Sequence, residues 1–138
     1  MKTRKKGGPF LNLHFKNLLL QIIQTYKEQG PLWKPGKDLL HLKKRISRRD
    51  LPLETTLHDY NNLITEIVTN SQSDIHIYHL EHFEQRYVVF SVNNWIVIIG
   101  EDKVMETAMI TRSPERYLSE EKGYTYMGTV KEVFSWSE

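Results

Sequence analysis

The spacing of apolar residues changes near Ser71, and this change constrains the fold of the chain more than any other feature. Before it, large apolar residues recur every three or four positions, which places them on one side of an α-helix. After it, apolar and polar residues alternate, or β-branched and aromatic residues cluster, as is typical of β-strands. The sequence therefore predicts helices first and a sheet afterwards, in an α+β fold.

Two or three helices are expected in the N-terminal half. Gly30-Pro31 ends the first helix, and Pro52 excludes continuation of the second. Asp38 is expected to cap the start of the second helix, and Trp33 to anchor the loop before it to the core. The expected helices cover residues 10–29, 38–48 and 56–70.

The second half is expected to form a four- to five-stranded antiparallel meander on which the helices pack. The links between its strands are short, whereas a parallel crossover needs a dozen residues or more. Asn93-Asn94 is a two-residue hairpin turn. After a turn or short helix near Pro114, a further strand contains Tyr124 to Tyr126. The first four expected strands cover residues 74–80, 86–92, 95–100 and 104–111.

Length and composition favour one cytoplasmic domain. The 138 residues suffice for a single hydrophobic core. Residues 1–9, rich in Lys and Gly, are expected to be a flexible basic tail before a single α+β domain of residues 10–138. No apolar run reaches the roughly 18 residues of a membrane span, and no signal peptide is recognisable. The chain has no cysteine, which excludes disulfides and cysteine-based zinc sites.

Charge is divided strongly along the chain. Residues 1–49 carry 13 Lys and Arg and 2 acidic residues, a net charge of +11, whereas residues 50–138 carry 6 basic and 15 acidic ones, a net charge of −9. This asymmetry indicates that the N-terminal part faces a polyanion or an acidic partner. Alternatively, the two parts neutralise each other within the fold.

A helical wheel divides the second expected helix into an apolar side and a basic side. On the basic side, neighbouring cations would lower the pKa of His41 until an anion binds. Arg and Lys stabilise the charge of a five-coordinate phosphorane, and an imidazole can move a proton at neutral pH. The basic side is therefore either a solvated surface or a site for a scissile phosphate. The wheel places Leu39, Leu42 and Ile46 on the apolar side, and His41, Lys44, Arg45 and Arg48 on the basic side.

Two segments within residues 38–111 carry a resemblance to a known group of proteins. They read HLKKRISRRDLPLETTLHDYNNLITEIV and RYVVFSVNNWIVIIGEDKVMETAMI. In them, a histidine, a downstream arginine and a helix precede a sheet of hairpins. This arrangement resembles the small ribonuclease toxins of the RelE and colicin D type, sometimes joined with barnase-like nucleases as one superfamily. By this resemblance, His41 and Arg45 match the helical histidine and basic residue, and Thr107, beside Glu106, matches a polar position on the last strand.

The resemblance implies an RNA endonuclease that needs no metal or other cofactor. The ribose 2′-oxygen would attack the phosphate and leave a cyclic phosphate, with His41 as acid or base and Arg45 in the phosphate clamp. RNA and an acidic inhibitor protein are the expected partners. The alternative is a noncatalytic module that binds nucleic acid or a protein through the basic half. The residues expected to contact RNA are Lys37, Lys43, Lys44, Arg48, Arg49, Arg86 and Arg112.

The histidines of HIYHLEH do not indicate a metal site. His76, His79 and His82 are three positions apart, and residues 76 and 79 of one strand face opposite sides of a sheet. The segment also lacks an obvious fourth ligand for zinc. The aromatic residues of the strands, such as Tyr87, Phe90 and Trp95, could stack on RNA bases, but they are more typical of the core or of a sheet face.

Overall fold

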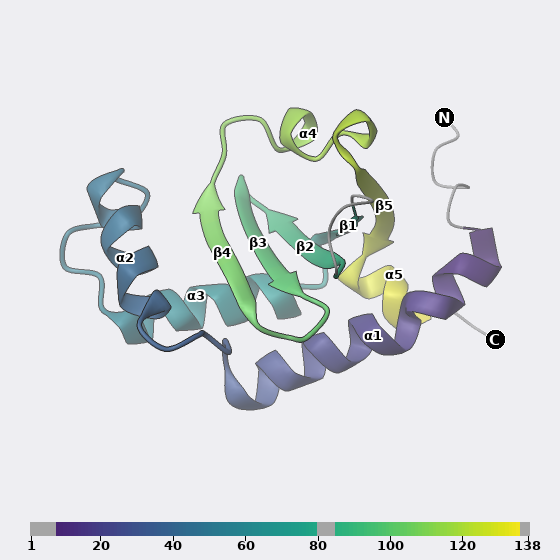
Figure 1. The fold of residues 1–138 in the computed structure, drawn as a ribbon, viewed down its shortest axis with the longest axis horizontal. Coiled ribbons are helices and arrows are strands. Elements are labelled where there is room, and N and C mark those ends of the chain that lie inside the picture. Colours follow the sequence, from purple (N-terminus) through teal and green to yellow (C-terminus); the bar gives the residue numbers. More distant parts are fainter. Residues whose placement is uncertain (1–7, 80–84, 136–138) are drawn as a thin grey trace.

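The computed structural model describes residues 8–79 and 85–135, and it confirms the expected α+β fold (Figure 1). Three helices come first and a five-stranded antiparallel sheet follows. The helices are α1 (Gly8–Gln29), α2 (Lys37–Ser47), α3 (Leu57–Thr69), α4 (Pro114–Tyr117) and α5 (Val130–Ser135), with a 3-10 turn, η2 (Glu120–Lys122). The strands are β1 (Asp74–Tyr78), β2 (Tyr87–Val92), β3 (Trp95–Gly100), β4 (Met105–Ile110) and β5 (Tyr124–Thr129).

The start of α1 corrects the expected boundary of the basic tail. The helix begins at Gly8, so Gly8 and Pro9 belong to it, and proline is well tolerated in a first helical turn because its missing N–H has no helical partner there. The rest of the expected tail, residues 1–7, lies outside the described residues. At the other end, Gly30 adopts φ 79 and donates its N–H to the carbonyl of Tyr26 at 3.0 Å, which ends the helix as predicted.

The N-cap of α2 differs from the prediction. Gly36, at φ 82, is the N-cap, whereas Asp38 lies in the first turn and accepts the Leu39 N–H at 2.8 Å. A carboxylate in the first turn still favours the helix through its dipole. Thr56 caps α3 in a reciprocal arrangement with Asp59, in which each side chain accepts the backbone N–H of the other residue.

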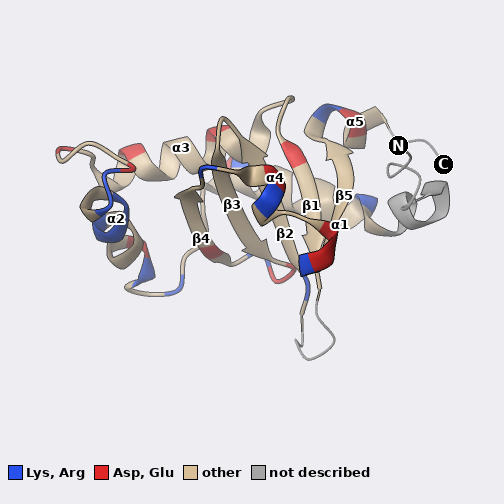
Figure 2. Cartoon of the chain, turned by 90° about the horizontal axis from the view of Figure 1, so that it is seen from above, with Lys and Arg blue, Asp and Glu red and all other residues tan. Residues whose placement is uncertain are grey.

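Strands β1 to β4 form the predicted meander, but β5 does not continue it. Asn93 and Asn94 have φ of 53 and 69, as a two-residue hairpin turn between β2 and β3 requires. The strand order is β4-β3-β2-β1-β5, so the last strand pairs with β1 at the far edge of the sheet. The chain after β4 therefore crosses the sheet, and it carries α4 over the face away from α1 and α3 (Figures 1 and 2).

The main core lies between the sheet and the helices α1 and α3. The opposite face of the sheet, called the open face below, carries a smaller buried cluster to which Leu118 contributes. Helix α2 lies outside this sandwich, beside the edge strand β4 (Figures 1 and 2). Among the described residues, no helix is both long and apolar enough to cross a membrane. The main core includes Leu19, Ile22, Ile64, Val68, Val88, Phe90, Val97 and Ile99.

Candidate functional site

His41 of α2 and Thr107 of β4 lie next to each other, although 66 positions separate them in the chain. The hydroxyl oxygen of Thr107 is 3.3 Å from Nδ1 of His41. Thr107 is paired with Ile98, whose side chain belongs to the open-face cluster, so the contact forms where α2 meets that face. The structure thus brings together His41 and Thr107, two residues that the resemblance matched to positions of the ribonuclease toxins.

The ring of Trp33 packs against the histidine. Its ring centroid is 5.2 Å from that of His41, with an angle of 35° between the planes. The indole N–H donates to the side-chain oxygen of Asn61 on α3 at 2.9 Å, and the ring packs against the main core. Trp33 therefore anchors its loop as predicted, and it also fixes one face of the imidazole.

The surroundings of His41 disfavour its charged form. Burial lowers its pKa from the ordinary value, and Arg45, Lys44 and Lys37 lower it further by repulsion. The carboxylate of Glu106 acts in the opposite direction. The helical wheel predicted the lowering by cations, whereas the larger contribution of burial arises from the tertiary fold. These surroundings favour the neutral imidazole of His41 at pH 7.

Arg45 does not lie on the open side of α2, and the wheel was wrong on this point. Its side chain is only 3% exposed, and Nη1 donates to Oδ2 of Asp50 at 3.2 Å. Leu39, which the wheel placed inward, is 55% exposed. The reason is that α2 packs against the polar edge of β4. There the backbone N–H of Ile110 requires an acceptor, and it donates to Oδ2 of Asp50 at 3.4 Å. In this position Arg45 holds the helix rather than a phosphate.

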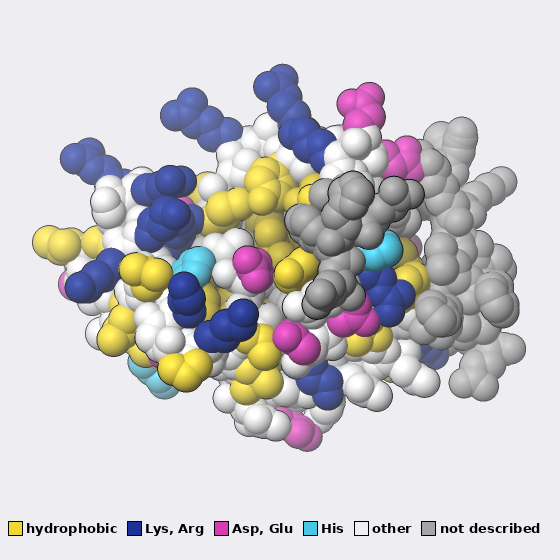
Figure 3. All heavy atoms as spheres, in the orientation of Figure 1, with side chains coloured by type: hydrophobic (Ala, Val, Ile, Leu, Met, Phe, Trp, Pro, Cys, Tyr) yellow, Lys and Arg dark blue, Asp and Glu magenta, His cyan; other side chains and the backbone are white. Residues whose placement is uncertain are grey.

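The remaining cations of α2 face solvent. A hollow of about 430 Å³ beside His41 is lined by Leu40, Lys43, Lys44 and Ser47. Figure 3 shows Lys and Arg side chains gathered at the end of the molecule that carries α2. This surface, called the basic surface below, consists of Lys37, Lys43, Lys44, Arg48 and Arg49, all exposed.

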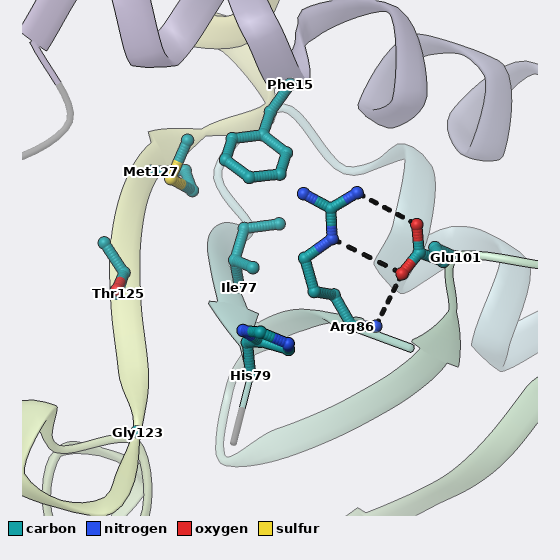
Figure 4. A pocket seen from close by; sticks show the side chains of 8 residues that line it. All are labelled: Phe15, Ile77, His79, Arg86, Glu101, Gly123, Thr125 and Met127. Atoms are coloured by element: carbon teal, nitrogen blue, oxygen red, sulfur yellow. Dashed lines mark hydrogen bonds and ion pairs between the residues drawn. The ribbon is translucent and has the colours of Figure 1, made fainter. Parts of the chain in front are cut away.

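The two other predicted RNA contacts lie elsewhere. Arg86 precedes β2 and is paired with Glu101, through Nε at 3.3 Å and Nη2 at 3.0 Å, with its guanidinium 4.9 Å from the ring centroid of Phe15 (Figure 4). It lines a different hollow, on the α1 side of the sheet, and the structure does not bring it to His41. Arg112 is exposed just beyond β4, two residues after Ile110 and therefore at the end of β4 that Asp50 holds.

Sequence reasoning missed how the tyrosines gather on the open face. A cleft of about 240 Å³ there is lined by four tyrosines and also by Val89, Ile98 and Glu106. The predicted meander brings Tyr78 and Tyr87 to neighbouring strands, but the pairing of β5 with β1, which adds Tyr124, has no signal in the sequence. We call this cleft the tyrosine slot; its tyrosines are Tyr78, Tyr87, Tyr117 and Tyr124.

The histidines of β1 behave differently from His41. His76 is largely buried on the open face and contacts the ring of Tyr126 at 5.2 Å between centroids, whereas His79 lines the hollow on the α1 side. Burial lowers the pKa of His76 to about 4. His82 lies outside the described residues. Within the described parts of the chain, no group of three metal-ligating side chains is arranged to hold a metal ion.

Comparison with known proteins gives no relative. The chain matches no model of a protein family, no curated protein and no solved structure. Its function must therefore be argued from the residues around His41.

Proposed function

We propose that the chain is an RNA endonuclease that works without a metal ion, with its active centre at His41 and Thr107. The observation that carries the proposal is the 3.3 Å contact between these two side chains at the border of the basic surface. A neutral imidazole held between a hydroxyl and an aromatic ring, beside exposed lysines, suits proton transfer at a phosphodiester.

In the proposed reaction, His41 takes the proton of the ribose 2′-hydroxyl. The 2′-oxygen then forms a bond to phosphorus, and the bond from phosphorus to the 5′-oxygen breaks. The ammonium of Lys44 gives a proton to the leaving 5′-oxygen, and Lys37 stabilises the charge on the other phosphate oxygens. The products are a 2′,3′-cyclic phosphate and a 5′-hydroxyl; His41 then gives its extra proton to water, and Lys44 takes one up.

Thr107 and Trp33 position the imidazole in this scheme. When Nδ1 of His41 donates to the hydroxyl oxygen of Thr107, Nε2 is left with a lone pair for the 2′-hydroxyl proton. The ring of Trp33 limits rotation of the imidazole. Both residues therefore act through His41, and we expect their loss to lower the rate less than loss of the histidine.

A second candidate function is noncatalytic binding of nucleic acid through the basic surface. The observation that favours it is the burial of Arg45 in its pair with Asp50. This pairing leaves lysines around His41. A lysine binds phosphate as a point charge and does not form the bidentate hydrogen bonds of a guanidinium. Such a module would bind RNA with strong salt dependence but would not cleave it.

An acidic inhibitor protein is the proposed protein partner. Leu39 and Leu40 are 55% and 56% exposed, between the lysines of the basic surface. A partner with acidic side chains around an apolar centre would cover these leucines and block access to His41. Co-expression of such a protein should relieve any growth defect that the chain causes in its host.

The experiment is a cleavage assay with purified chain, single-stranded RNA and excess chelator. The proposal expects cleavage with cyclic-phosphate and 5′-hydroxyl ends, reduced by His41→Ala at least about 100-fold. His58→Ala is the matched control, because His58 is an exposed histidine of α3. Binding of RNA by both variants should stay within about twofold of the parent chain. RNA that is bound but left intact by the parent chain would favour the second candidate and exclude the first.

A further inference from the structure

The tyrosine slot lies beside the proposed active centre, and we propose that it binds one base of a single-stranded RNA by stacking. This inference deepens the proposed function, because it rests on RNA as the ligand and identifies where the chain would contact a base. The same proposal assigns Glu106 as the group that accepts hydrogen bonds from the edge of that base.

The strand pairing places the slot in a row across the open face. Tyr87 of β2 is paired with Tyr78 of β1, and Tyr78 is paired with Tyr124 of β5. On the other side of Tyr87, the row ends at Gly100 of β3, where the side chains of Gln85 and Asp102 occupy the place of a Cβ. The row is therefore aromatic along three strands, and the slot continues from it over Val89 and Ile98 to Glu106, which lies at an irregularity in the pairing of β4.

The rings form a continuous wall. Tyr78 and Tyr124 are 4.5 Å apart between ring centroids, and Tyr78 and Tyr87 are 6.5 Å apart. Tyr117 of α4 adds to the wall at 5.9 Å from Tyr124. Aromatic side chains on a sheet face are a common platform for bases of single-stranded RNA, since every base has a π-face.

The chemistry of the slot suits a base better than a phosphate or an aliphatic group. Its walls are aromatic and its floor contains Val89 and Ile98, both buried. Its one ionisable carboxylate, that of Glu106, would repel a phosphate but can accept hydrogen bonds from amino and ring N–H groups of a base. The phosphates would instead follow the basic surface on the other side of Glu106.

The position of the slot also fits one strand of RNA that passes the active centre. Glu106 lines the slot and at the same time acts electrostatically on His41. Thr107, next to it, is two strands across and two residues along from Tyr87, or about 12 Å at the usual spacings of a sheet. A base in the slot would therefore belong to a nucleotide close to the phosphate at His41.

The test measures binding with a strand that cannot be cleaved, so it is independent of catalysis. Short 2′-O-methyl RNA strands are titrated with the intact chain, and in each strand a different position lacks its base. We expect one abasic position to weaken binding about 5- to 50-fold. In Tyr87→Leu, loss of the base at the same position should weaken binding less than about twofold, because the stacking partner is already absent. Tyr87→Phe, which keeps the ring, should retain the full penalty.

Tyr126→Leu is the control, because Tyr126 lies on the same face but does not line the slot. An abasic penalty of equal size in the intact chain and in Tyr87→Leu would overturn the inference, and so would the absence of any position-dependent penalty. If the expected pattern appears but the chain leaves cleavable RNA intact, the slot stands and the proposed catalysis fails.

The contribution of Glu106 is measured by changing the base at the position where loss of the base weakens binding. The pairing edge of uracil has one ring N–H between two carbonyl oxygens, whereas that of guanine has a ring N–H and an amino group side by side, so uracil should bind about tenfold more weakly than guanine. In Glu106→Gln this difference should fall to about twofold, since an amide can donate as well as accept. Equal discrimination before and after the substitution would remove Glu106 from the proposal.

Discussion

The guanidinium of Arg45 lies 3.2 Å from the carboxylate of Asp50, and both side chains are largely withdrawn from solvent. Oδ2 of Asp50 also accepts the amide of Ile110 at 3.4 Å. The pair therefore joins the C-terminal end of α2 to the edge strand β4. Since α2 carries His41 and β4 carries Thr107, the same pair fixes the geometry of the candidate active centre.

Asp50→Ala should destabilise the chain strongly, because it leaves the guanidinium of Arg45 buried without a counter-charge. We expect a loss of about 3 kcal/mol in the free energy of unfolding, measured by urea denaturation. Arg48→Ala, at an exposed position of the same helix end, should change it by less than about 0.5 kcal/mol. A loss below about 1 kcal/mol in Asp50→Ala would show that the pair does not hold α2.

Much of the fold was predictable because it depends on local patterns. The three helices follow from apolar spacing and from Gly30, and the β2–β3 hairpin from Asn93-Asn94. The direction in which α2 packs was predictable only in part, because Leu42 is buried and Ile46 packs against the core as the wheel placed them, but Leu39 is exposed. A helical wheel assumes that apolar residues turn inward, but α2 packs against a strand edge, where a charged pair is favoured over Leu39.

The candidate site was predictable only in part, and for a similar reason. The resemblance selected both His41 and Thr107, but their contact depends on the placement of α2 beside β4, which no local pattern encodes. The tyrosine slot depends on β5 crossing to pair with β1. Such long-range pairing joins Tyr78 to Tyr124 across 46 positions of the sequence.

Asn94→Gly should stabilise the hairpin between β2 and β3. Asn94 has φ of 69, a left-handed conformation that glycine adopts without the steric cost of a Cβ, and Asn-Gly is the preferred pair in turns of this kind. We expect a gain of about 0.5 kcal/mol in the free energy of unfolding, measured by thermal and urea denaturation. Asn94→Val should instead lose about 1 kcal/mol or more. Equal stability of the two variants would contradict the assigned turn.

The stability of the chain should fall in mild acid because of His76. Burial lowers the pKa of this histidine to about 4 in the folded state, whereas it is near 6.5 in the unfolded chain. The contribution of neutral His76 to the free energy of unfolding is therefore complete above pH 6.5. It is lost as pH falls from about 6.5 to 4, because the unfolded state takes up a proton that the folded state does not. The expected loss is about 3 kcal/mol over that range.

His76→Phe tests this account, because it keeps an aromatic ring against Tyr126 but cannot take up a proton. The free energy of unfolding, measured between pH 7 and pH 4, should fall less steeply in this variant than in the parent chain. His58→Phe, at an exposed position, is the control for the exchange of a histidine for a phenylalanine. Parallel pH profiles for the parent chain and His76→Phe would contradict the assignment.

The pKa of His41 should respond to the lysines of the basic surface. The pKa of His41 is lowered first by burial, then by Arg45 and Lys44, so Lys44→Met should raise it toward 6.5. NMR titration of the His41 ring proton measures this directly, and salt of about 1 M should reduce the difference between parent chain and variant, since screening weakens the repulsion. Lys27→Met, on α1, is the control and should have no effect. If His41 acts as the base, the fall of kcat/KM in acid should follow, in the parent chain, the same pKa that the NMR titration of His41 gives in the absence of RNA; two different values would exclude His41 as that base.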